Sequence, residues 1–275
     1  MSSSNDPVEI CFELLRREGL LVDSCLAFGL TQLAKSASKE YEGYILTGLM
    51  GTAQGVERLL KLAHVVMYFE DHQIFPSSNQ IKNFGHNIED LLDDCRGSKR
   101  GSVLDWNESE KPIAKKFIWV LTEYGRGKRY SNFDHLHEAT MSRSHPLADW
   151  LNLLTIAGND EQTKRRLKRA NIDMEVLAKL FEGKVVGEYS DLQGQSVCHK
   201  QALIERQLMR IATPKVLASL ILGLQPVFRI LNEAGHACRE RNGGSMCVPF
   251  FCEVFAHLVD QSRTELCRRK NWYYR

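Results

Sequence analysis

The segment from Glu123 to His135 gathers side chains that could act on a phosphate group. It carries three cations, an amide and an imidazole, at Arg126, Lys128, Arg129, Asn132 and His135. Arginine and lysine donate charged hydrogen bonds to phosphate oxygens, and histidine can move a proton near neutral pH. Because glycines interrupt the helical pattern here, we expect a loop, and loops often hold binding and catalytic residues. This segment is therefore the leading candidate for a functional site.

A structural role fits the same segment. Tyr130 and Phe133 could pack on neighbouring helices, while salt bridges could hold the three cations. The side chain of Asn132 or Asp134 could cap a turn. The residues alone leave both roles open.

Two groups of polar residues further upstream could take part in the same chemistry. Glu57 and Lys61 stand four residues apart on one face of a predicted helix, and their simplest interpretation is a solvated ion pair. His86 follows Gly85 within the pattern of another helix, and a glycine lets a ligand or a second backbone come close. His86 is therefore a candidate for binding RNA or phosphate, with a structural bridge between helices as the alternative.

A strongly basic run occurs later in the chain. Lys164-Arg-Arg-Leu-Lys-Arg169 places cations at all but one of its positions, on a predicted helix. Such a run could contact phosphates without reading a base sequence. A solvated helix face is the simpler interpretation.

The composition is that of an ordinary globular protein. The chain has 275 residues, a hydrophobic share of 43% and a formal net charge of +2, so attraction to nucleic acid must come from local patches. Its 8 cysteines are scattered through helical patterns, which favours reduced thiols in a cytosolic protein. In the C-terminal region only His236 and Cys238 have the close spacing of metal ligands. We therefore expect no metal and no other cofactor.

We expect no targeting or membrane segment. The first residues, Met1 to Asn5, are polar and lack the apolar centre of a signal peptide. No apolar run approaches the roughly 18 residues of a membrane span. The prediction is a cytoplasmic protein with no membrane partner.

Apolar residues recur at spacings of three and four along most of the chain, which predicts an all-α protein. The predicted helices cover 7–18, 20–37, 41–69, 80–95, 112–124, 145–156, 159–182, 200–211, 214–240 and 248–269. The helices on either side of residue 40 should form an antiparallel hairpin, and 185–197 could hold a short hairpin of strands. One helical face carries Gly43, Gly48, Gly51 and Gly55. Close helix packing would offset their cost of about 1 kcal/mol each.

Several of these segments, in this order, carry a family resemblance. They are Gly55-Val-Glu-Arg-Leu-Leu-Lys61, the Gly85-His86 region, Arg129-Tyr-Ser-Asn132 and Phe250-Phe-Cys-Glu-Val-Phe255. Together they resemble the HEPN superfamily, most clearly over 20–135 and more loosely over 214–269. The resemblance implies a single domain of 1–275, built as an up-and-down helical bundle with additional helices. Residues 140–210 would then be a helical insertion.

The resemblance also implies an activity. Many HEPN proteins are metal-independent ribonucleases of toxin or defence systems, and they use an arginine followed by a histidine at the spacing of Arg129 and His135. Arg129 would stabilise the charged transition state and His135 would transfer a proton. The RNA-binding residues would be Arg126, Lys128, Asn132 and His86. A homodimer, an RNA partner and an antitoxin-type partner are expected from the same resemblance.

Other HEPN proteins lack the catalytic pair and act as non-catalytic modules for nucleotide binding, protein interaction or dimerisation. In this chain Tyr130 directly follows Arg129, where the family usually has a polar residue such as Asn, Asp or His. This difference favours the non-catalytic alternative.

Overall fold

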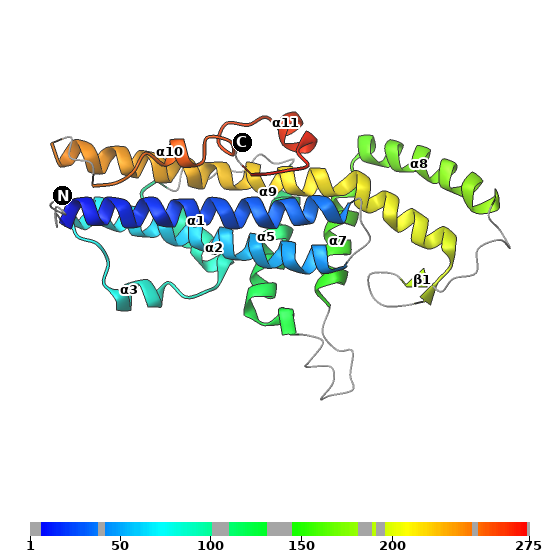
Figure 1. Cartoon of the computed structure of the whole chain (residues 1–275), viewed down its shortest axis with the longest axis horizontal. Helices are drawn as coiled ribbons and strands as arrows, with labels where there is room; N and C mark the ends of the chain where they lie inside the picture. The colour runs from blue at the N-terminus through cyan, green and yellow to red at the C-terminus, as the bar shows by residue number, and fades with distance from the viewer. Residues whose placement is uncertain are drawn as a thin grey trace, which may run out of the picture.

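The computed structural model describes residues 7–37, 42–100, 110–130, 145–180, 189–190, 196–243 and 247–273. Within these residues the backbone is mainly helical, so the prediction of an all-α protein is confirmed. Three long helices lie side by side and form the frame (Figure 1). They are α1 Pro7–Ser36, α2 Glu42–His72 and α9 His199–Arg241.

Shorter elements complete the described fold. The helices are α3 Ser78–Asn83, α4 Ile88–Gly97, α5 Lys111–Arg126, the 3-10 helix η2 Lys128–Tyr130, α7 Pro146–Gly158, α8 Glu161–Leu180, α10 Phe251–Val254 and α11 Arg263–Arg268. Strand β1 Tyr189–Ser190 pairs antiparallel with β2 Ser196–Val197. The short hairpin predicted within 185–197 is therefore confirmed.

Helices α1 and α2 approach each other more closely than ordinary side chains allow. A Cβ atom at Gly29 of α1 would lie 2.3 Å from a backbone nitrogen of α2. Cβ atoms at Gly48, Gly51 and Gly55 of α2 would lie 2.6, 2.7 and 2.8 Å from side chains of α1. The predicted close packing is confirmed at these three glycines, whereas a Cβ at Gly43 would meet nothing within 4 Å.

Two predicted helix breaks are wrong, because tertiary packing keeps both helices intact. Helix α1 continues through Gly19, where an added Cβ would lie 3.0 Å from the ring of Phe251. Helix α9 continues through Pro214. An internal proline costs about 3 kcal/mol, but Ala212 and Val216 on either side are fully buried in the core. Burial of this helix therefore outweighs the local cost.

The hydrophobic core joins helices that are far apart in the sequence. The indole of Trp150 in α7 is fully buried and meets the ring of Phe117 in α5 edge-on, with 5.7 Å between ring centroids. Helix α7 thus belongs to the core of the bundle. Helix α8 instead packs on the N-terminal part of α9, where Lys200 pairs with Glu175 at 2.9 Å. Residues 140–210 were expected to form one insertion, but the two helices described before α9 lie in different places, α7 in the core and α8 on the N-terminal part of α9.

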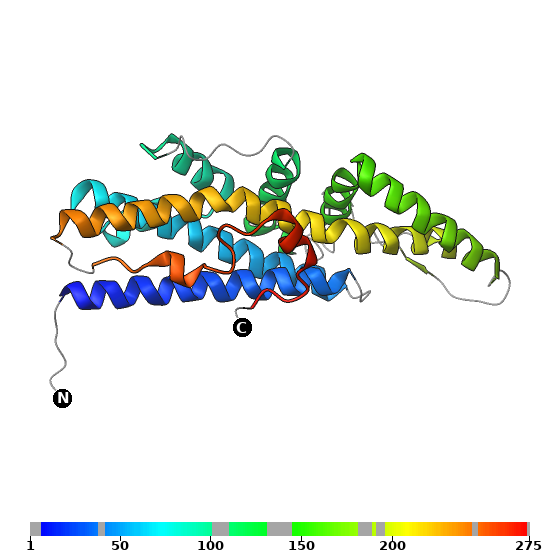
Figure 2. The same cartoon turned by 90° about the horizontal axis from the view of Figure 1, so that it is seen from above.

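The predicted helix over 248–269 is wrong. This segment is mostly not helical and lies between α1 and α9 (Figure 2). Its regularly spaced apolar residues are aromatic and aliphatic side chains that are buried against these two helices. The chain turns at Asp260, whose φ is 57°, and α11 begins after Ser262. Ser262 and Glu265 form a capping box, which fixes that new start.

The predicted helix over 80–95 is also wrong, because it is two short helices. Ser77 caps α3 with its side chain, and Asn87 caps α4. Between them Gly85 has a φ of 68°, a left-handed conformation that favours glycine and ends the first helix. His86 therefore lies on a turn rather than inside a helix.

Among the described helices, α9 is the one that is long and apolar enough to cross a membrane by length and composition. However, 78% of its most apolar stretch is buried inside the fold. Core helices of soluble proteins pass the same test. The helix is therefore weak evidence for a membrane span.

Candidate functional site

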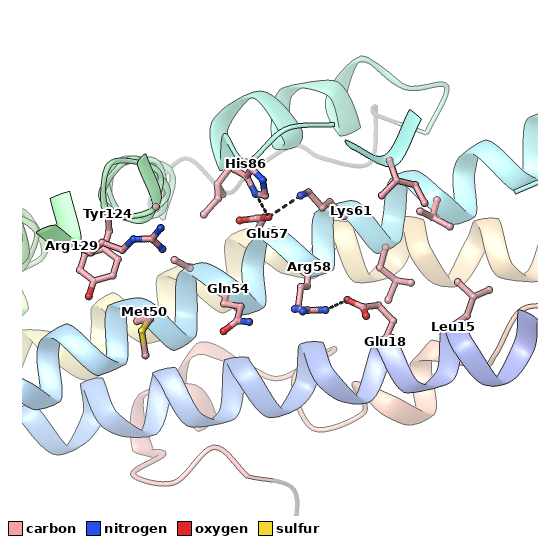
Figure 3. Close-up of a pocket in the computed structure, with 16 residues that line it drawn as sticks. Leu15, Glu18, Met50, Gln54, Glu57, Arg58, Lys61, His86, Tyr124 and Arg129 are labelled. Carbon is pink, nitrogen blue, oxygen red and sulfur yellow. Dashed lines mark hydrogen bonds and ion pairs between the residues drawn. The ribbon is translucent and has the colours of Figure 1, made fainter. Parts of the chain in front are cut away.

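A groove with a volume of about 870 Å³ follows α2 (Figure 3). Helix α1 forms one side, while the turn before α4, the end of α5 and η2 form the other. Its charged lining residues are Glu18, Glu57, Arg58, Lys61 and Arg129, and the imidazole of His86 lies among them. Its apolar lining includes Leu15, Met50, Val65 and Ile81. The groove thus offers both charge and an apolar floor to a ligand.

Helical spacing explains the polar wall that α2 contributes. Residues three and four apart share a helix face, and this wall consists of Gln54, Glu57, Arg58 and Lys61. Gly55, one residue after Gln54, faces α1 instead, where an added Cβ would meet Leu26 at 2.8 Å. Close packing on one face of α2 therefore leaves the polar face open to the groove.

Two side chains contact the same carboxylate oxygen of Glu57. Lys61 Nζ and His86 Nδ1 each lie 2.8 Å from Glu57 Oε1. The side chain of Glu57 is 25% exposed and that of His86 is 82% exposed. Glu57 thus links α2 to the turn before α4 and holds a solvent-accessible imidazole at the groove.

The turn that carries His86 is fixed by its neighbours. The ring of Phe84 lies 5.4 Å from the ring of His64 in α2, measured between centroids. On the other side, Asn87 Oδ1 accepts a hydrogen bond of 3.1 Å from the backbone of Glu89 at the start of α4. The backbone around His86 is therefore anchored at both ends.

Arg58 joins the polar face of α2 to the α1 side of the groove. Its Nη1 lies 2.6 Å from Oε1 of Glu18 in α1. The hydrogen bond with Glu18 raises the pKa of Arg58 above its ordinary value, although burial opposes this. Arg58 thus stays charged but is already paired with a carboxylate.

Arg129 reaches the groove from the opposite side. Gly127, with a φ of 140°, ends α5 and redirects the chain into η2, so the glycine break predicted in this segment is confirmed. The Arg129 side chain is exposed, and its guanidinium lies 4.9 Å from the centroid of the Tyr130 ring. Within the described residues no carboxylate pairs with Arg129. Its charge is therefore accessible to an anionic ligand.

Lys128 is held in a structural contact. Its Nζ lies 2.8 Å from Oδ2 of Asp149 in α7 and 3.6 Å from Oε2 of Glu123 in α5. It also lies 4.6 Å from the centroid of the Trp119 ring, and its side chain is only 14% exposed. Lys128 therefore fastens η2 to α5 and α7, and the residues that line the groove do not include it.

The remaining predicted site residues are placed as follows. Arg126 is exposed, lies 3.5 Å from Glu123 and is not among the groove-lining residues. His135 and Asn132 lie outside the described residues. Of the six residues predicted from the sequence, the structure thus brings His86 and Arg129 to one groove.

The described residues contain no group of three or more His, Cys, Asp or Glu that could hold a metal ion. Their cysteines are unpaired. Burial raises the pKa of Cys95 and of Cys238 to about 12, so neither thiol is a ready nucleophile. The apolar spacing around Cys252 and Cys267 predicts that both are buried in the core, and this prediction is wrong for Cys252, whose side chain is exposed.

Sequence reasoning missed Gln54 and Arg58 as groove residues. A signal was available, because they precede Glu57 and Lys61 at helical spacing and extend the same polar face. The contribution of Glu18 carried no such signal, because it depends on how α1 packs against α2.

Comparison with protein-family models, with curated proteins and with solved structures finds no match to this chain.

Proposed function

We propose that this protein acts on RNA as a metal-independent endoribonuclease, with a HEPN-like bundle as its frame. One observation carries the proposal: an accessible guanidinium, from Arg129, and an accessible imidazole, from His86, line the same groove. They come from distant parts of the sequence. An RNA segment lying along the groove would meet both groups.

The chemistry follows from these side chains. In RNA cleavage the 2′-oxygen attacks the adjacent phosphorus, its proton leaves, and the bond from phosphorus to the 5′-oxygen breaks as that oxygen gains a proton. Arg129 would stabilise the added negative charge on the phosphate oxygens. His86 would transfer one of the protons through Nε2, since Nδ1 faces Glu57 at 2.8 Å. The predicted second proton carrier is His135.

Glu57 and Lys61 would act as positioning residues. A carboxylate on one ring nitrogen sets the orientation and the tautomer of a histidine. Lys61, at 2.8 Å from the same carboxylate oxygen, would hold Glu57 in place and add positive charge to the groove. This role differs from the solvated ion pair that is the simplest interpretation of the sequence.

RNA cleavage in excess chelator tests the proposal. Wild-type protein should cleave a mixed RNA, and Arg129→Ala, His86→Ala and His135→Ala should each lower the rate by about 10²-fold or more. His236→Ala is a matched control, because His236 is exposed and lies outside the groove. Full activity in the Arg129 and His86 variants would reject the proposed site.

A non-catalytic module is the second candidate. The apolar part of the groove favours it, since Met50 is 48% exposed and Ile81 is 38% exposed. These side chains could hold a nucleobase or a protein segment while the cations hold a phosphate. Binding of RNA without cleavage, lost on Arg129→Ala, would favour this candidate. A cytoplasmic homodimer with an antitoxin-type partner remains part of both proposals.

A further inference from the structure

Helix α8 presents a strong positive charge outside the groove. Its first turns carry five exposed cations, which we call the basic strip: Lys164, Arg165, Arg166, Lys168 and Arg169. Figure 1 shows α8 lying over the N-terminal part of α9, near one end of the long axis. The strip is therefore built on a helix that packs on α9 and stands apart from α1 and α2.

The corner that starts α8 is firmly anchored. Asp160 Oδ1 accepts hydrogen bonds of 3.1 Å from the backbone of Gln162 and Thr163, which caps the helix. Lys215 Nζ of α9 lies 2.5 Å from Asp160 Oδ2 and 2.9 Å from the carbonyl oxygen of Ala157. The start of α8, just before the basic strip, is thus held against α9.

Most of the strip is not neutralised within the described fold. Lys164 lies 3.6 Å from Glu161, but both side chains are more than half exposed, at 52% and 79%. Such a pair is weak. In the part of the chain that the structure describes, no carboxylate pairs with Arg165, Arg166, Lys168 or Arg169. Other exposed cations, such as Lys99 with Asp71 at 2.9 Å, do have an acidic partner.

We infer that the basic strip of α8 binds the phosphate backbone of base-paired RNA. Arg165 and Arg169 stand one helical turn apart, about 6 Å along the axis, so that one helix can contact neighbouring phosphates of a strand. Arginine suits this task because its planar guanidinium can bind a phosphate through two hydrogen bonds. The choice of RNA rests on the proposed function.

The residues of α8 favour paired RNA over a single strand. Single-strand binding sites combine cations with aromatic side chains on which bases stack. Helix α8 has no aromatic residue in its sequence, EQTKRRLKRANIDMEVLAKL. The strip can therefore hold a backbone but has no platform for bases.

The same helix fits a membrane surface less well. Membrane-bound amphipathic helices insert large apolar residues, often Trp, Phe or Leu, beneath a basic face. Among the α8 residues whose burial the structure describes, the exposed large apolar ones are Ile172 and Val176, and the exposed Asp173 and Glu175 stand among them. These carboxylates would be repelled by an anionic bilayer.

Fluorescence anisotropy with a labelled RNA duplex tests this inference in the full-length protein. The triple variant Arg165→Gln, Arg166→Gln and Arg169→Gln should bind the duplex at least 10-fold more weakly at low salt. The slope of log K against log salt should become shallower by about 2 to 3, because three phosphate contacts are lost. Replacing the same three residues with lysine keeps the charge and should restore most of the salt dependence.

The matched control changes the same net charge elsewhere. It combines Lys99→Gln, Arg229→Gln and Arg268→Gln, which are exposed and lie outside both α8 and the groove. The inference predicts that this control binds the duplex like wild type. Equal loss of affinity in both triple variants, or no loss in the α8 variant, would overturn it.

Two further arms separate the inference from the proposed ribonuclease. Vesicles of phosphatidylcholine with phosphatidylserine test the membrane alternative, and loss of vesicle binding with unchanged duplex binding would overturn the inference. Cleavage of a short single-stranded RNA tests the groove. Duplex binding that depends on α8, in a protein that cleaves nothing, would support the inference and reject only the ribonuclease.

Discussion

His86 Nδ1 lies 2.8 Å from Glu57 Oε1, which joins a turn that follows α3 to the middle of α2. The imidazole remains 82% exposed, so the contact orients the ring without burying it. Such an arrangement keeps one ring nitrogen for the protein and leaves the other for a ligand. Glu57, on the polar face of α2, thereby orients the imidazole that we propose transfers a proton.

Replacing Glu57 with Gln should therefore impair cleavage more than folding. We expect the RNA cleavage rate to fall about 10-fold or more, because the ring of His86 loses its orienting carboxylate. The free energy of unfolding should change by less than about 1 kcal/mol, because the glutamine oxygen can still accept hydrogen bonds from Lys61 and His86. Cleavage rates across pH and urea unfolding would measure the two effects.

Glu13→Gln is the control for that substitution. Glu13 pairs with Arg16 at 3.5 Å and Arg17 at 3.3 Å on α1, and it does not line the groove. It should retain wild-type cleavage. If Glu57→Gln were equally active, the proposed positioning role of Glu57 would be wrong.

Gly29→Ala should destabilise the protein. An added Cβ would lie 2.3 Å from a backbone nitrogen of α2, so the two helices would have to separate. We expect a loss of about 1–3 kcal/mol in the free energy of unfolding. Gly43→Ala, where an added Cβ meets nothing within 4 Å, should be neutral or more stable by up to about 1 kcal/mol. Equal urea midpoints for the two variants would contradict the close α1 and α2 contact.

Arg263→Ala should also destabilise the fold. Arg263 Nη1 lies 2.6 Å from Oε1 of Glu110, whose side chain is 4% exposed, and the Ser219 hydroxyl donates to the same carboxylate. Removing the arginine leaves a buried carboxylate without its cation, which costs about 3 kcal/mol. The exposed pair of Arg229 and Asp260, at 3.3 Å, gives the comparison. Arg229→Ala should cost less than about 1 kcal/mol, and a similar loss in both variants would argue against burial as the cause.

The buried pair of Asp23 and His257 should make stability depend on pH. His257 Nε2 lies 3.2 Å from Asp23 Oδ1, and the two side chains are 7% and 17% exposed. Burial raises the pKa of Asp23 from 3.8 to about 6. Burial also lowers the pKa of His257 from 6.5 to about 4, and the nearby Arg269 adds to this.

These two shifts have opposite effects on stability. The contribution of Asp23 is present below pH 3.8 and is lost as pH rises through about 6. The contribution of His257 is present above pH 6.5 and is lost as pH falls through about 4. Asp23→Asn removes the contribution of Asp23, which stabilises the wild-type protein at low pH. When the pH falls from 7 to 4, the free energy of unfolding of this variant should therefore decrease by about 2 kcal/mol more than that of wild type. In His257→Gln the free energy of unfolding should decrease less than in wild type over the same pH range. If the free energy of unfolding depended on pH in the same way in all three proteins, the pair could not be the source of the pH dependence.

The helical class could be predicted from the sequence because apolar residues three and four apart mark buried helix faces. The same rule failed at Phe251, Phe255 and Leu258, which are buried at that spacing in a chain that is mostly not helical. The helix break predicted at Pro214 is also wrong. The low helix propensity of proline indicates a break, but propensity does not take account of the burial of the neighbouring residues. Local patterns thus predicted the class of structure better than the ends of its elements.

The candidate site was predicted only in part. Arg129 and His86 were chosen for their chemistry and their neighbouring glycines, and both line the groove. The pairing of His86 with Glu57 could not be predicted, because it depends on the left-handed turn at Gly85 and on how α4 packs against α2. Lys128 looked like a phosphate ligand, but Asp149, a residue of another helix, holds it.

The most direct test is the rate at which purified protein cleaves single-stranded RNA in excess chelator, compared between wild type and Arg129→Ala. Arg229→Ala serves as the arginine control. Our proposal predicts cleavage by wild type and by the control, with a loss of about 10²-fold or more in Arg129→Ala. Equal cleavage by all three proteins, or none by wild type, would contradict it.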